Sequence, residues 1–65
     1  MDLYPEVRRQ LEDANCHFVA MIRPGVEGWF SPRMGASFTV DNPIRSTSNA
    51  NNILRNAGCA PIFRQ

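Results

Sequence analysis

A chain of 65 residues forms one domain at most. A chain this short buries only about 60% of the surface that it exposes when unfolded, so its core is small. A small core argues against catalysis in a deep cleft. Hydrophobic residues make up 43% of the chain and charged residues 20%, which predicts a folded protein. No apolar run reaches the roughly 18 residues of a membrane span, and the acidic start differs from a basic signal peptide, so we predict a soluble, cytoplasmic protein without a membrane partner.

The first predicted element is a helix that begins at Pro5, whose missing N–H costs nothing at the first helical position, and runs to about Ala14. Its apolar stripe has four members with helical spacing: Leu3, Val7, Leu11 and Ala14. Asn15 tolerates the left-handed backbone conformation that ends a helix, so we expect the chain to turn there into a strand.

Three short strands are predicted at residues 18–23, 29–31 and 36–40, because glycine and proline interrupt this apolar stretch where hairpin turns would fall. Strict alternation predicts one apolar, helix-facing side with these members: Phe18, Ala20, Ile22, Ala36, Phe38 and Val40. Trp29 and Phe30 are adjacent, so one of them enters the core and the other is left on the outer sheet face or at an edge.

The second predicted helix follows a cluster of N-cap residues, Ser46, Thr47 and Ser48, any of which suits the cap, and ends at Gly58. Its apolar stripe consists of Ala50, Ile53, Leu54 and Ala57. Its exposed face is expected to carry Asn49, Asn51, Asn52, Arg55 and Asn56. In the tail, Ile62 and Phe63 are too apolar to leave in water, which predicts that the tail folds back or binds something.

Together these elements predict an α+β fold: a single small domain of order α-β-β-β-α, with a three-stranded antiparallel sheet and two helices packed on one face. The domain spans residues 1–65, with a core at 4–59 and a short C-terminal tail at 60–65. The most buried side chains are expected to be Leu11, Phe18, Ile22, Phe38, Val40, Ile53 and Leu54.

Few residues offer chemistry. Cys16 and Cys59 lack metal-ligand spacing, so no metal site is predicted, and reduced thiols are expected, with a disulfide between the two helix ends as the alternative. His17 begins the first strand out of phase with Phe18, which indicates an ordinary surface or edge residue rather than an acid or base.

The order of elements and the ending Ile53-Leu54-Arg55-Asn56-Ala57-Gly58 resemble the HicA toxin family, small mRNA interferases with a double-stranded-RNA-binding-like fold. Members of that family end their last helix in a similar Ile-Leu-Lys-Gln-Ala-Gly pattern. The resemblance covers roughly residues 4–59 and implies that fold, together with a role in a toxin–antitoxin system.

The chain departs from the family at the catalytic motif, a Gly-Ser-His-His pattern at the turn into the second strand. Residues 25–28 align with that motif, and Glu27 or Gly28 stands in the position of the catalytic His. A Glu exposed in a glycine loop should titrate near 4, far from the neutral pH at which a ribonuclease needs its base. Glu27 is the one catalytic candidate, without an acid partner, so we predict a chain that has lost ribonuclease activity and needs no cofactor.

Three functions remain open at this point. The first is a HicA-like module of a toxin–antitoxin or mobile-element system that binds RNA or a protein partner, and the second is an active mRNA interferase with altered catalytic residues. The third is a phage or mobile-element inhibitor that blocks a host nuclease complex, as anti-CRISPR proteins do. The partner is expected to be RNA or a protein such as an antitoxin. The residues expected to contact it are Trp29, Arg33, Asn52, Arg55 and Asn56.

Overall fold

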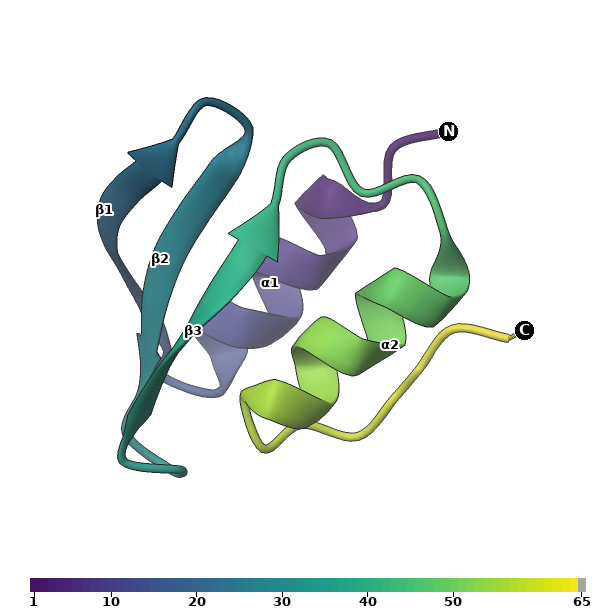
Figure 1. The fold of residues 1–65 in the computed structure, drawn as a ribbon. Coiled ribbons are helices and arrows are strands. Elements are labelled where there is room, and N and C mark those ends of the chain that lie inside the picture. The colour runs from purple at the N-terminus through teal and green to yellow at the C-terminus, as the bar shows by residue number, and fades with distance from the viewer. Residues whose placement is uncertain (65) are drawn as a thin grey trace.

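The computed structural model describes residues 1–64 and confirms the predicted α+β order. The elements are α1 (Tyr4–Asp13), β1 (His17–Arg23), β2 (Val26–Ser31), β3 (Ala36–Asp41) and α2 (Thr47–Asn56). The strands form one antiparallel sheet in the order β1-β2-β3, and both helices lie on the same side of it (Figure 1). Within residues 1–64, neither ten-residue helix has the length and apolar character to cross a membrane.

The first helix forms as its sequence predicts. Pro5 lies in its first turn, Val7 and Leu11 are fully buried, and Asn15 ends the segment with a φ of 66°. The Asp2 carboxylate accepts hydrogen bonds from the backbone N–H groups of Tyr4, at 2.9 Å, and Ile44, at 3.0 Å. This one side chain therefore fixes the start of α1 against the loop that leads to α2.

In α2, Ser46 is the cap, because its hydroxyl accepts a hydrogen bond of 3.0 Å from the backbone N–H of Asn49. The predicted stripe is confirmed, with Ala50, Ile53, Leu54 and Ala57 all buried. Gly58 follows with a φ of 81°, the conformation that favours glycine at this position.

The predicted exposure of Asn51 is wrong. Asn51 is 2% exposed, its Nδ2 donates to the carbonyl of Phe63 at 2.8 Å, and its Oδ1 accepts from the N–H of Phe63 at 3.1 Å. The amide thus satisfies both backbone groups of one tail residue. The tail folds back over α2 as one of the two expected outcomes, although Gln65 lies outside the described residues.

The core differs from the prediction in its sheet residues. Leu11, Val40, Ile53 and Leu54 are buried as expected, whereas Phe38 is only partly buried. Phe18 and Ile22 are 46% and 56% exposed, so their assignment to the core is wrong. The buried hydrophobic residues are Val7, Leu11, Cys16, Trp29, Val40, Ile44, Ala50, Ile53, Leu54 and Ala57.

Two irregularities in β1 explain the error at Ile22, and the position of β1 at the edge of the sheet explains the error at Phe18. The pairing with β2 shifts between Phe18 and Ala20 and again between Met21 and Arg23, as it does when a bulge places two residues opposite one. Phe18 pairs with Trp29 and Met21 with Glu27, so the helix-facing residues of β1 are Phe18 and Met21 rather than every second residue. Figure 1 shows β1 at the edge farthest from α2, where the helices leave it uncovered.

Candidate functional site

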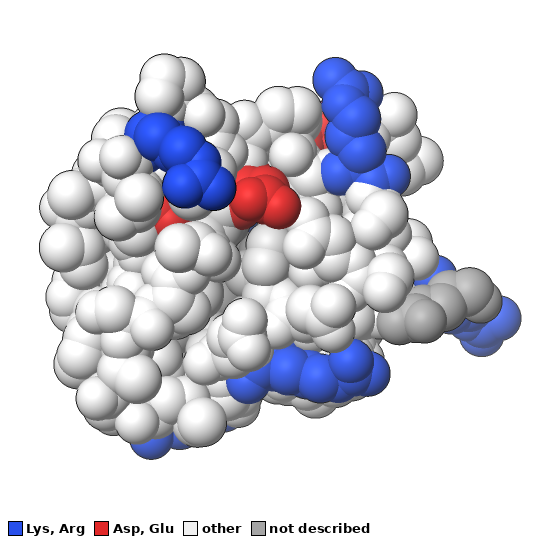
Figure 2. Space-filling view, viewed as in Figure 1, with Lys and Arg blue, Asp and Glu red and all other residues white. Residues whose placement is uncertain are grey.

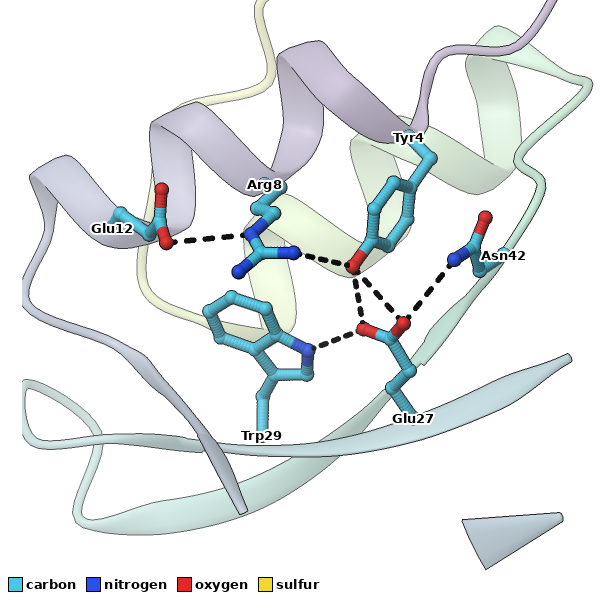
Figure 3. Close-up of polar contacts among 6 residues, drawn as sticks. All are labelled: Tyr4, Arg8, Glu12, Glu27, Trp29 and Asn42. Atoms are coloured by element: carbon cyan, nitrogen blue, oxygen red, sulfur yellow. Dashed lines mark hydrogen bonds and ion pairs between the residues drawn. The ribbon is translucent and has the colours of Figure 1, made fainter. Parts of the chain in front are cut away.

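Glu27 is the centre of a buried polar cluster, contrary to the exposed loop position predicted for it. It lies in β2, faces α1 and is 7% exposed. Its carboxylate accepts hydrogen bonds from the Tyr4 hydroxyl at 2.8 and 3.0 Å, from Trp29 Nε1 at 2.9 Å and from Asn42 Nδ2 at 3.2 Å (Figure 3). Three segments of the chain, α1, β2 and the loop after β3, therefore meet at one carboxylate.

Arg8 covers this cluster from the solvent side. Its guanidinium lies 5.9 Å from the centre of the Trp29 ring, within the range of a cation–π contact. The same side chain donates to Glu12 at 3.3 Å and to the Tyr4 hydroxyl at 3.5 Å (Figure 3). The arginine thus adds a positive charge beside Glu27 without contacting it directly.

The hydrogen bonds set the charge state of Glu27. Burial alone would raise its pKa, but the hydrogen bonds donated by Trp29, Tyr4 and Asn42, with the charge of Arg8, lower the pKa below its ordinary value of 4.5. Burial and the bond to Glu27 raise the pKa of Tyr4. Glu27 is therefore a carboxylate at neutral pH whose neighbour holds its own proton firmly, which suits a structural clamp and not proton transfer.

This clamp predicts a loss of stability in acid. The pKa of Glu27 is lower in the folded protein than in the unfolded chain. The stabilisation that Glu27 adds to the free energy of unfolding is therefore complete above about pH 5 and is lost as the pH falls through the folded pKa. Glu27→Gln should cost about 2 kcal/mol of unfolding free energy at pH 7, the value of hydrogen bonds to a charged group. Urea unfolding at pH 7 and pH 3 measures the effect.

In that experiment the variant should lose less stability between the two pH values than the parent protein. Asp2 leaves some acid dependence in the variant, because the backbone N–H groups of Tyr4 and Ile44 lower the pKa of Asp2 as well. Glu6→Gln, at an exposed carboxyl in the first turn of α1, is the matched control and should behave as the parent does. An equal acid loss in the parent and in Glu27→Gln would disprove the clamp.

The structure brings four of the five predicted binding residues together and separates the fifth. Arg33, Asn52, Arg55 and Asn56 are exposed around the C-terminal half of α2. Arg33 Nη1 donates to the carbonyl of Gly58 at 2.9 Å, and Arg55 Nη1 donates to Asn52 Oδ1 at 3.2 Å. Their role in binding remains a prediction.

Trp29 is the residue that lies elsewhere. It faces the helices, is 1% exposed and donates its N–H to Glu27, so Trp29 is the member of the aromatic pair that enters the core, where it is not accessible to a partner. Phe30 is the aromatic residue of the outer face, where its ring is partly buried and lies 5.6 Å from the ring of the exposed His17.

The outer face of the sheet, away from the helices, carries an apolar hollow that sequence reasoning missed. The hollow has a volume of about 210 Å³ and is lined by Val19, Ala20, Ile22, Gly28, Trp29, Ser37, Phe38 and Thr39. Gly28 leaves room for it, since a Cβ built on this residue would stand 2.9 Å from Ile22 Cδ1. A glycine within the middle strand, opposite an apolar edge strand, is the sequence signal for this hollow.

The two thiols are free, which agrees with the reduced state expected for them. Cys16 is buried and Cys59 partly buried, and burial with the neighbouring Cys16 raises the pKa of the Cys59 thiol. A raised pKa lowers the thiolate fraction at neutral pH, so Cys59 is a poor nucleophile. Within residues 1–64, no three His, Cys, Asp or Glu side chains are grouped closely enough to hold a metal ion.

The positive charges are dispersed on the face that Figure 2 shows. The basic side chains on this face stand apart, with uncharged surface and, between the two at the top of the view, acidic surface separating them (Figure 2). A nucleic-acid interface needs several basic groups on one continuous surface, because its affinity grows with the number of phosphates contacted. This face therefore lacks the charge pattern of a strong phosphate-binding surface.

Comparison with known proteins returns no match for this chain among family models, curated proteins or solved structures. The geometry of the residues described above is therefore what bears on function.

Proposed function

We propose that this chain is a HicA-like module of a toxin–antitoxin or mobile-element system that acts in the cytoplasm by binding a protein partner and does not cleave RNA. The order of one helix, three strands and one helix is the order that the resemblance implies. The observation that carries the choice of a protein partner is the apolar outer face of the sheet.

The outer face supports a protein partner because it offers both area and shape. Val19 and Ile22 are 58% and 56% exposed and border the hollow, and Thr39 forms its opposite wall. Exposed apolar surface with a pocket is typical of sites that take an apolar anchor side chain of another protein. A volume of about 210 Å³ accommodates one large side chain such as Leu or Phe. An antitoxin or a host nuclease complex are partners of this kind.

The clamp at Glu27 supports a loss of ribonuclease activity. Glu27, one of the two residues that align with the catalytic His of the HicA family, is ionised, buried and engaged with three donors, and the other, Gly28, has no side chain. A general base needs free access to the proton that it removes from the substrate. Purified protein should therefore leave RNA intact near neutral pH, and Glu27→Ala should change no cleavage rate.

The proposed function is tested with a substitution that places a large side chain in the hollow and so blocks the anchor side chain of a partner. Thr39→Trp adds a large side chain at an exposed position of β3 that faces Gly28 across the strand pair. The partner is first captured on immobilised protein from bacterial lysate and identified, and its affinity is then measured by calorimetry. Loss of the anchor contact should weaken binding about 30-fold, the effect of removing one central contact.

Arg9→Trp, an equally large substitution at an exposed position of α1, is the matched control and should bind as the parent does. Binding should also change little with salt. The proposal fails if Thr39→Trp binds as the parent does, or if the captured partner is RNA whose affinity falls steeply with salt and is lost in Arg33→Ala and Arg55→Ala. The second outcome would assign function to the α2 face instead.

A further inference from the structure

Strand β1 is an edge strand whose middle residues carry neither a charge nor a proline, although its pairing with β2 is irregular at two positions. All seven of its residues are exposed, and the five between His17 and Arg23 are uncharged. Four large apolar side chains lie there, about half exposed: Phe18 at 46%, Val19 at 58%, Met21 at 55% and Ile22 at 56%. Isolated domains usually place a charge or a proline on such an edge, because its free N–H and C=O groups otherwise pair with another strand.

We propose that β1 pairs antiparallel with β1 of a second copy of this chain, so that the two three-stranded sheets become one continuous sheet across a two-fold axis. The register follows from the side-chain directions that the bulges impose. Phe18 and Met21 both face the helix side, so the pairing that places Phe18 opposite Met21 of the second copy keeps matching faces together. The axis then passes between Val19 and Ala20.

This register explains why Phe18 and Met21 are exposed although they face the helix side. The Phe18 ring lies nearly perpendicular to the Trp29 ring, with 6.3 Å between ring centres, and remains 46% exposed. In the dimer each Phe18 is covered by Met21 of the other copy, and each Met21 by Phe18. The apolar layer under the helices then continues across the axis without a gap.

Self-complementarity favours a second copy as the occupant of this edge. The central residues of β1 carry no charge, so two identical strands meet without repulsion between like charges. A two-fold pairing covers the β1 edge of each copy, so the assembly ends at two chains. A specific interface covers about 600 Å² or more per partner. That is about one seventh of the 4072 Å² surface of the chain, and the exposed residues of β1, four of them large apolar side chains that are 46–58% exposed, contribute to that area.

The dimer does not rest on the proposed function, although Val19, Ala20 and Ile22 of β1 line the hollow and lie near the proposed axis. The hollow lies on the outer face, whereas Phe18 and Met21 lie on the helix side, so pairing would leave two hollows on one face of the joined sheet. A variant at Met21 therefore tests the dimer without changing the lining of the hollow.

The test is sedimentation equilibrium in reducing buffer from micromolar to millimolar concentration, with circular dichroism to show that each variant is folded. The mass of the parent should rise from 7.3 kDa towards twice that value. Met21→Lys should remain at 7.3 kDa over the whole range, since its ammonium would be buried against Phe18 of the other copy. Met34→Lys, the same change at a methionine that is 54% exposed in the β2–β3 turn, should dimerise as the parent does.

The register is tested by nuclear magnetic resonance on a mixture of copies with labelled methionine methyl groups and unlabelled copies. An intermolecular contact between the Met21 methyl group and the Phe18 ring is expected. A parent protein that remains at 7.3 kDa at every concentration would overturn the proposal, and so would a Met21→Lys variant that associates as the parent does. A dimer without the Phe18 to Met21 contact would overturn the register.

Discussion

Replacing Trp29 with Ala is expected to unfold most of the protein, with a loss of about 3–5 kcal/mol of unfolding free energy. Trp29 is the largest fully buried side chain, and it holds Arg8 above its ring and Glu27 at its N–H. The substitution leaves a cavity in the core and removes one donor from a buried carboxylate, and both effects destabilise. Because stability amounts to roughly 0.05–0.15 kcal/mol per residue, a chain of 65 residues has about 3–10 kcal/mol in total, and a loss of this size removes much or all of it.

Urea unfolding followed by circular dichroism measures this loss, and two further variants locate its cause. Trp29→Phe keeps an aromatic ring in the core but lacks the N–H that donates to Glu27. Its free energy of unfolding should therefore fall by the contribution of that hydrogen bond, about 1.5–3 kcal/mol, which is less than the loss in the alanine variant. Phe30→Ala, on the outer face, should lose the least because its ring is only partly buried. A folded Trp29→Ala protein with parental stability would instead support a surface role for the tryptophan.

Leu54→Ala should cost about 2–5 kcal/mol and lower the melting temperature strongly. Leu54 has no exposed surface, and it lies on the α2 stripe that faces the sheet, beside Ile53 and Ala57. Its backbone carbonyl also accepts the N–H of Cys59 at 2.8 Å, so the residue fixes the end of the helix as well as the core. Truncation leaves a cavity that a two-layer domain has few side chains to refill.

Thermal unfolding checks this prediction, with Arg55→Ala as the adjacent control. Arg55 is exposed and donates only to Asn52, one helical turn away, so its loss should change stability by about 0.5 kcal/mol or less. Equal melting temperatures for the parent and Leu54→Ala would contradict the assignment of this helix face to the core.

Local sequence patterns determined the elements and their order. The stripes of α1 and α2 repeat at helical spacing, and Asn15 and Gly58 take the left-handed backbone conformations that their positions require. Each of these features depends on neighbours within a few residues, so the sequence alone was sufficient to predict the two helices and the sheet between them. The ends of the strands were predicted less accurately than the helices, because β2 begins at Val26 rather than at Trp29.

The tertiary structure decided which side of the sheet each residue faces. Alternation predicts faces only for a regular strand, and the two irregularities in β1 turned Ile22 outwards and Met21 towards the helix side. The same pairing placed Trp29 in the core beside Glu27. The alternation of residues along the strand had allowed either Trp29 or Phe30 to take that position.

The tertiary structure also decided which polar residues are buried. Glu27 is satisfied by Tyr4, 23 residues away, and Asn51 by Phe63, 12 residues away. A polar side chain enters the interior only where partners from distant segments replace its water, and no local pattern specifies such partners. The sequence alone therefore determined the helices and the order of the fold, whereas long-range hydrogen bonds and strand register determined the candidate site.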